Sequence, residues 1–427
     1  MAVNLHQQCK DRLKQQLAEA LAFAKVKNGS YIDRYSLARV LLIEDTLPSN
    51  GTQRDLLENY VSESPLFDFV YGSLSKEINE NQKYNSDIPE QELNQIEEYN
   101  DLAAVSERLV ETLDSLPWKY CLTFKLNPEI TAYLENEVTQ ISDDIKILRT
   151  GNELVENFPL QSGLPGKDQY LHGGGLLGLA GPAEWNEDKL HVQIMVDGFF
   201  GKWTSTSPEL KAIDALKSTL GLLIAMRAFK VEHSYSASIV KSRFYIHKED
   251  NGWCIDDSGE LNNDISKTIG DLRIDDINGH LDTDIEKSRH VRHCLESVSK
   301  ALAAGNISEK IKLAGQWLFD SYCGQNELLS YIQTTVSLEI LLGEKAVSDL
   351  VGLGELLRNR CAYLIGTSHA QREEVLSDFK KIYDIRSKIV HRGKSRLSID
   401  ERSLFRRLQW IVSRVIQEEV KLIGKNA

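Results

Sequence analysis

The 427-residue sequence has no apolar run that approaches the roughly 18 consecutive residues a membrane-spanning helix requires. Its first residues, MAVNLHQQCKDRLKQQ, lack the basic start and the apolar block of a secretory signal. The six cysteines are far apart and none forms a Cys-x-x-Cys pair, so neither a disulfide framework nor a zinc site is expected. Together these absences predict a cytoplasmic protein with free, reduced thiols.

The net charge of −13 would by itself argue against nucleic-acid binding, but the charge is unevenly distributed. Between Lys380 and Arg414 there are eleven Lys and Arg residues and three acids. This segment therefore carries +8, and the rest of the chain carries −21. A basic segment on an acidic body is the pattern of a local phosphate-binding surface. Charge alone also allows a solvated helix face.

The length predicts two or three domains rather than one core. Residues 1–112 form a helical N-terminal region, in which residues 46–100 are polar and loop-rich. Residues 113–285 are predicted to form an α+β domain, because four strand-like segments surround a Leu-rich helix at 207–229. The strand-like segments are 118–125, 144–148, 191–196 and 243–247. The Asp-rich stretch 254–286 is expected to be a surface excursion from this domain.

From residue 286 to 427 the periodicity is helical throughout and predicts an all-α bundle. The expected helices lie near 286–304, 308–323, 326–342, 348–365, 369–391 and 398–424. Ser308, Ser368 and Ser398 are expected to cap the starts of their helices, and Gly393 to end one of them.

The basic segment contains Arg386 and His391, and His391 is the only one of ten histidines with an Arg five residues before it. Ile382, Ile385 and Ile389 supply the buried stripe of the helix, so Arg386 and His391 are free for another role. The helix C-terminus favours a protonated imidazole, and a histidine near neutrality suits proton transfer. The planar charge of an arginine suits a phosphate or its transition state.

Four further cations lie close to this pair and are predicted to bind an RNA backbone. They are Lys388, Arg392, Lys394 and Arg396. Cleavage of RNA by its own 2′-hydroxyl needs both a base and an acid, whereas one chain offers a single His. Two copies that meet across a two-fold axis would supply both groups.

The segment from Leu338 to Gly393 resembles the HEPN superfamily, and its Apea-like branch in particular. The resemblance rests on a Leu-Glu-rich helix, an Arg-x-Arg helix and the ending YDIRSKIVHRG, and it covers only the C-terminal part of the chain. Ser387 stands where active members most often have Asn, Asp or His. Arg392 is inserted before the glycine that often follows the histidine directly.

The resemblance implies an all-α bundle that forms a homodimer or higher homo-oligomer and brings two R-x4-H motifs into one endoribonuclease site. Such sites need neither metal nor cofactor, and such proteins act as bacterial toxins or antiviral effectors. Arg386 and His391 would be the catalytic pair, with Ser387 and Glu339 in support. The expected partners are RNA, with tRNA among the candidates, and a phage-derived or protein trigger. Residues upstream of 286 would sense that trigger or select the substrate.

Two other interpretations remain open from the sequence. In the first, the bundle is a non-catalytic RNA-binding or dimerisation module, and Arg386 pairs with Asp384 or with a helix terminus. In the second, the chemistry lies around His172 and the three glycines 173–175, which resemble an esterase oxyanion loop. No G-x-S-x-G nucleophile elbow accompanies that loop, so a plain glycine loop is favoured.

Two further clusters were considered as ligand sites. The Asp-rich run 256–286 does not fit the spacing of a calcium-binding loop, so a solvated acidic loop is favoured. The run from Arg289 to His293 is a second basic patch without a carboxylate or cysteine at metal-ligand spacing, and a surface role or contact with RNA is expected for it.

Overall fold

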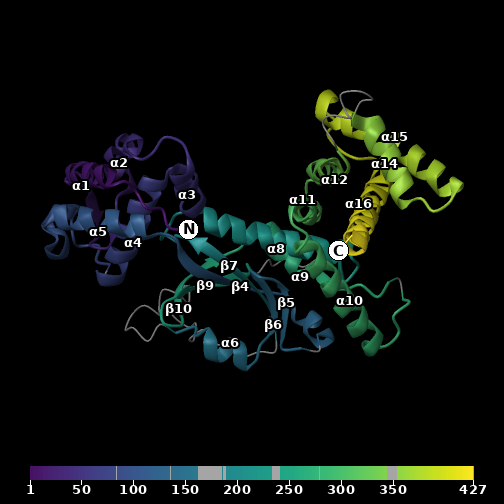
Figure 1. Ribbon diagram of the computed structural model, residues 1–427, viewed down its shortest axis with the longest axis horizontal. Helices are drawn as coiled ribbons and strands as arrows, with labels where there is room; N and C mark the ends of the chain where they lie inside the picture. The colour runs from purple at the N-terminus through teal and green to yellow at the C-terminus, as the bar shows by residue number, and fades with distance from the viewer. Residues whose placement is uncertain are drawn as a thin grey trace.

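The structure is a computed structural model that describes residues 1–82, 84–134, 136–161, 185, 189–232, 241–277, 279–343 and 353–426. In this part of the chain all strands precede residue 275, and only helices follow. Figure 1 shows the N-terminal helices at one end, the large sheet in the middle and the last helices at the other end. The α+β fold class is confirmed at this coarse level, and the HEPN-like character of the last helices stays a prediction.

The N-terminal region is a group of helices with a hydrophobic core of its own, built from residues 3–116 and Phe199. Its main helices are α1 (Gln7–Leu21), α3 (Thr52–Tyr60), α4 (Pro65–Asn81) and α5 (Leu102–Ser115), joined by α2 (Ala38–Leu42) and the small strands β1 (Lys25–Lys27), β2 (Tyr31–Ile32) and β3 (Gln91–Glu92). The prediction that residues 46–100 are loop-rich is wrong for α4, which begins at a proline and buries Phe69, Val70 and Leu74. Its buried residues surround the helix, so no amphipathic stripe marks it in the sequence.

The central element is a six-stranded antiparallel sheet in the order β10-β9-β4-β7-β6-β5. The strands are β4 (Trp118–Lys125), β5 (Val138–Ser142), β6 (Ile145–Arg149), β7 (Leu190–Gly198), β9 (Arg243–Glu249) and β10 (Trp253–Glu260). Four of these match the predicted strands to within a few residues. One face packs on α8 (Ser207–Ala225), and α6 (Asn152–Asn157) lies on the other side of the sheet (Figure 1).

The Asp-rich stretch is not the surface excursion that the sequence suggested. It contains β10, α9 (Asn263–Gly270) and β11 (Leu272–Ile274), and β11 pairs with β8 (Phe229–Val231). Ile265 and Leu272 from this stretch are buried in the core. Its acids lie between these apolar residues, and Asp256 pairs with Lys76 of α4. The stretch therefore contributes folded strands and a helix to the domain, and not only a loop.

The C-terminal part consists of helices α10 (Asp284–Leu302), α11 (Asn306–Asp320), α12 (Glu327–Leu342), α14 (Leu353–Ile365), α15 (His369–Arg392) and α16 (Ile399–Asn426). The predicted helices agree with these bounds to within a few residues, except that the start predicted at 348 for the fourth of them lies outside the described residues. Ser368 and Ser398 cap α15 and α16, since each side-chain oxygen accepts a backbone N–H three residues on. Ser308 is not a cap: it lies inside α11 and its hydroxyl donates to the Leu302 carbonyl oxygen.

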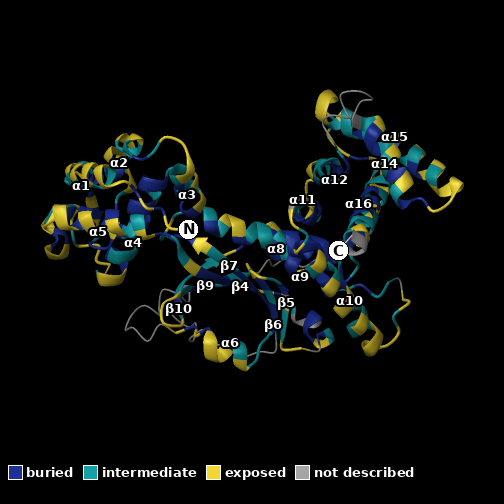
Figure 2. Ribbon diagram, viewed as in Figure 1, coloured by how far each residue is buried: buried dark blue, intermediate teal, exposed yellow. Residues whose placement is uncertain are grey.

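One hydrophobic core runs from the sheet through α8 into the last helices, from Tyr120 to Val420. Figure 2 shows the buried residues continuing along α8 to α11 and α16. Gly221 of α8 faces Gly315 of α11, where an added Cβ on Gly315 would lie 2.9 Å from the Ser218 carbonyl oxygen. The predicted domain boundary at 285 stays a prediction, and the packing across it is continuous.

Candidate functional site

The helix that carries Arg386 and His391 is α15, and its position is fixed by an apolar stripe. Phe379, Ile382 and Ile385 are almost fully buried against the neighbouring helices. The helix ends at Gly393, whose φ of +63° and ψ of +37° place it in the left-handed region that favours glycine. The predicted buried stripe is thus confirmed for Ile382 and Ile385, and Arg386 lies beside it.

Arg386 is held by α12. One guanidinium nitrogen, Nη2, lies 3.3 Å from Oε1 of Glu339, and the two side chains are only 29% and 19% exposed. The Tyr383 hydroxyl donates to the same carboxylate oxygen at 3.2 Å. Burial, and secondarily the adjacent Glu339, raises the pKa of Tyr383, so its hydroxyl stays protonated and remains a donor. Glu339 therefore receives two contacts from α15. The ion pair holds the guanidinium of Arg386, and the hydrogen bond from Tyr383 orients the carboxylate.

The guanidinium is only partly engaged by this contact. Nε of Arg386 is buried and has no hydrogen-bond partner. The sequence interpretation in which Arg386 pairs with Asp384 or a helix terminus is wrong, because its partner is Glu339. The Arg386 side chain stays 29% exposed beside this ion pair, so it retains surface at which a second anion can bind.

His391 lies in the last turn of α15 and is exposed. In the described part of the chain no hydrogen bond or ion pair engages its imidazole. Five residues along a helix correspond to about 140° of rotation and about 7.5 Å of rise, so Arg386 and His391 do not share one face. A single chain therefore presents the two groups separately, and His391 is free to contact another molecule.

The four cations predicted to bind an RNA backbone fall into two groups. Lys388, Arg392 and Arg396 are exposed, and none of them forms an ion pair within the described residues. Lys394 instead pairs with Glu401 at the start of α16 at 3.0 Å. Ser387 is half-buried between Arg386 and Lys388. Three cations thus remain available near the end of α15, and one has a structural partner.

Tyr383 begins the ending YDIRSKIVHRG, but no role in this site was predicted for it. The residue lies one helical turn before Arg386, a spacing that places two side chains on neighbouring surface of a helix. The spacing was readable from the sequence, whereas its common partner on α12 was not, because Glu339 lies 44 residues upstream of Tyr383.

The other predicted clusters have different outcomes. His172 and glycines 173–175 lie outside the described residues. In the second basic patch, His290 is half-buried and its Nε2 is 2.9 Å from the carbonyl oxygen of Arg227, so this histidine joins α10 to the end of α8. His293 is exposed, as a surface role requires.

In the part of the chain that the structure describes, no three His, Cys, Asp or Glu side chains converge as a metal site. Within the same residues, none of the helices combines the length and the apolar character needed to cross a bilayer.

Comparison of the chain with protein-family models, curated proteins and solved structures gave no match. The likeness to the HEPN superfamily therefore rests on the residues of this chain, and the geometry around Arg386 and His391 has to support the function by itself.

Proposed function

We propose that this protein is a metal-independent endoribonuclease of the HEPN type that acts as a homodimer. The observation that carries the proposal is the state of Arg386, because Glu339 positions its guanidinium while the side chain stays 29% exposed to a second anion. A free imidazole, His391, and three unpaired cations lie near the same end of α15. This set supplies a proton-transfer group, an oxyanion-binding group and backbone-binding charge.

The proposed reaction is transesterification at a phosphodiester of RNA. The 2′-oxygen attacks phosphorus, its proton passes to one His391, and the bond from phosphorus to the 5′-oxygen breaks. The second His391, from the other copy, gives a proton to the departing 5′-oxygen. Arg386 stabilises the charge that develops on the non-bridging oxygens. The products are a 2′,3′-cyclic phosphate and a 5′-hydroxyl end.

The cellular role that fits this activity is that of a toxin or an antiphage effector whose upstream residues respond to a trigger. The acidic body would keep the basic end of α15 from binding RNA at random. The role is tested by expression: the wild-type chain is expected to inhibit growth when triggered, and the His391→Ala chain is not.

The biochemical test compares cleavage of RNA by the wild type, Arg386→Ala and His391→Ala. His369→Ala is the matched control, because His369 is an exposed histidine at the opposite end of the same helix. Cleavage is expected to fall by at least about 100-fold for both site variants and to be unchanged for the control. Equal activity of His391→Ala and His369→Ala would contradict the proposal.

The second candidate function is a non-catalytic RNA-binding or dimerisation module. The Glu339–Arg386 ion pair favours it, because an arginine held by a carboxylate also serves a purely structural role. In that case wild type and His391→Ala would bind RNA equally well and neither would cut it.

A further inference from the structure

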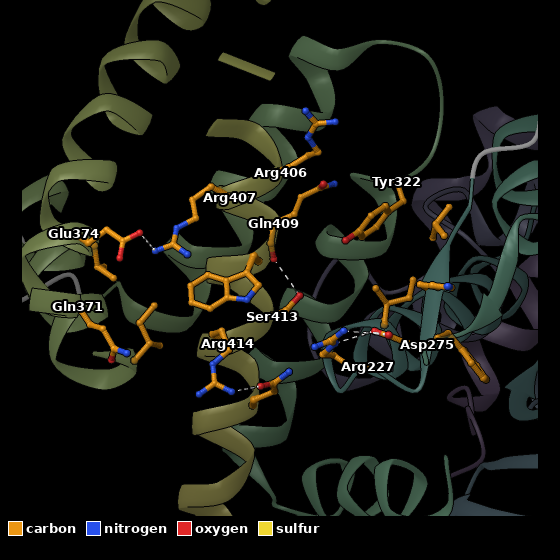
Figure 3. A pocket seen from close by; sticks show the side chains of 18 of the residues that line it. Arg227, Asp275, Tyr322, Gln371, Glu374, Arg406, Arg407, Gln409, Ser413 and Arg414 are labelled. Atoms are coloured by element: carbon orange, nitrogen blue, oxygen red, sulfur yellow. Dashed lines mark hydrogen bonds and ion pairs between the residues drawn. The ribbon is translucent and has the colours of Figure 1, made fainter. Parts of the chain in front are cut away.

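A second, separate site is formed where α16 faces the end of α8. A cleft of about 840 Å³ lies between α16, the first turns of α15 and the segment from Ile224 to Val231. Figure 3 shows Arg406, Arg407 and Arg414 of α16 on one side and Tyr322 and Arg227 on the other. Trp410, also on α16, lines the same cleft. Pockets for small ligands commonly measure about 300–1,000 Å³, so the cleft has room for one.

The cleft exposes an aromatic ring. Trp410 is 44% exposed, whereas Leu408 and Ile411 beside it on α16 are fully buried. The guanidinium of Arg407 lies 4.2 Å from the centre of its ring. Glu374 and Asp378 hold that guanidinium at 3.0 and 3.1 Å. The Arg407 guanidinium thus packs against the indole of Trp410. The exposed part of the ring faces the cleft.

The lining contains five cations, four of which already pair with carboxylates. Lys230 pairs with Glu232 at 2.8 Å and with Asp276 at 3.5 Å. Arg227 is neutralised by Asp275 at 2.9 Å, and Arg414 contacts Glu418 at 3.0 Å. Arg406 is exposed and has no ion-pair partner among the described residues. An unpaired guanidinium lies one helical turn from the open indole, a spacing that suits an anion attached to a flat ring.

The cleft also offers neutral hydrogen-bonding groups. Burial, together with the nearby Asp275, raises the pKa of Tyr322 to about 12, so its hydroxyl stays protonated. The side-chain oxygen of Gln371 accepts from the Thr367 backbone and hydroxyl, which leaves its amide nitrogen as a donor on the α15 wall. Neutral donors beside an aromatic ring are what the edge of a nucleobase requires.

From these features we propose that the cleft binds a nucleotide, with its base stacked on Trp410 and its phosphate at Arg406. The proposal does not depend on ribonuclease activity, because none of these residues belongs to the Arg386 and His391 site. Since α8, α15 and α16 each form part of the wall, a bound nucleotide would join the sheet domain to the helix that carries that site.

The adjoining groove indicates a short ligand. Along α15 and α16 the next pocket is lined by five carboxylates and three cations, and it leads from Glu374 and Arg407 toward Lys388. A net negative groove disfavours a phosphate backbone that runs from the cleft through it, whereas Lys388 is itself exposed and accessible to RNA from solvent. We therefore expect a free nucleotide to bind better than a long strand that would have to pass through this groove.

The test measures binding to the full-length protein by calorimetry and by thermal shift. The probes are AMP, GMP, ATP and GTP, adenosine without phosphate, inorganic phosphate, and a four-nucleotide RNA. At least one nucleotide is expected to bind and to raise the melting temperature. It should bind more tightly than adenosine and than phosphate, because stacking and charge act together. Binding of the four-nucleotide RNA without binding of any free nucleotide would overturn the proposal, because it would show that the cleft recognises a strand.

Variants locate the binding. Trp410→Ala is expected to weaken it roughly 5- to 100-fold, Trp410→Phe less, and Arg406→Gln only for ligands that carry phosphate. Trp203→Ala and Arg12→Gln are the matched controls: Trp203 is 46% exposed on the opposite part of the molecule and Arg12 is an exposed arginine of α1. Absence of binding by every nucleotide, or binding that Trp410→Ala leaves unchanged, would overturn the proposal.

Discussion

The ion pair between Glu339 and Arg386 is predicted to be stronger than its length suggests. Its two atoms are 3.3 Å apart, and the side chains are 29% and 19% exposed. Exposed pairs contribute about 0–1 kcal/mol, and breaking a fully buried pair costs about 3–5 kcal/mol. This pair lies between those limits, so a coupling free energy of about 1–2 kcal/mol is expected.

A double-mutant cycle with Glu339→Gln and Arg386→Met measures that coupling. Glutamine keeps an oxygen to which Tyr383 can donate, so the substitution removes the ionic contact and leaves the neighbouring hydrogen bond. The free energy of unfolding is measured by urea titration and circular dichroism, for the transition in which the C-terminal helices unfold. The coupling should change little with added salt, because both groups are largely desolvated.

The matched control is the pair between Arg402 and Glu327, which also joins two C-terminal helices. Its atoms are closer, at 2.8 Å, but its side chains are 49% and 43% exposed. Because exposure and not distance governs the energy, its coupling should stay below about 0.5 kcal/mol and fall further in salt. A larger coupling for the control pair, or none for Glu339 and Arg386, would refute the reasoning.

Three further outcomes are expected. Gly315→Ala should lower the free energy of unfolding by about 2–3 kcal/mol in a urea titration, because its Cβ would meet the backbone of α8. Gly393→Ala should cost about 1 kcal/mol and Gly393→Asn less, since the left-handed conformation penalises a Cβ and asparagine tolerates it. Burial lowers the pKa of His191 to about 3 and of His247 to about 4, so both stay neutral in the folded protein while the unfolded chain protonates near 6.5. The free energy of unfolding should therefore be constant above pH 6.5 with respect to these two histidines and should fall as the pH drops toward 4, by up to about 2.7 kcal/mol per pH unit. Urea titrations at several pH values measure this slope, and His247→Gln should remove about half of it.

The elements that the sequence predicted well are those with local signals. Helix α15 has a serine cap at Ser368, a regular apolar stripe and a glycine at its end, and its bounds agree with the prediction. Strand β4 alternates β-forming residues and was placed correctly. Local periodicity and capping decide such elements, because their neighbours only reinforce what the segment itself favours.

The elements that it missed depend on distant partners. Helix α4 is buried all round, so its apolar residues give no stripe. The Asp-rich strand β10 is stabilised by pairing with β9, and Asp256 has its counter-charge on Lys76 of α4. A carboxylate whose partner lies 180 residues away looks like loop composition in the sequence.

The candidate site was predictable only in part for the same reason. Arg386 and His391 lie on one helix, so their spacing was visible. Glu339 was singled out through the resemblance, and its contact with Arg386 follows from the packing of α12 on α15. The cleft around Trp410 was missed, because its walls come from residues 224–231, 365–375 and 406–417 together with Asp275 and Tyr322, which are far apart in the sequence.

The central claim is that Arg386 and His391 cut RNA without a metal ion. The most direct measurement incubates the purified protein with total RNA and tRNA in the presence of EDTA, beside His391→Ala, and identifies the ends produced. We predict cuts by the wild type only, with 2′,3′-cyclic phosphate and 5′-hydroxyl ends. Cleavage that persists in His391→Ala, or that EDTA abolishes, would contradict the claim.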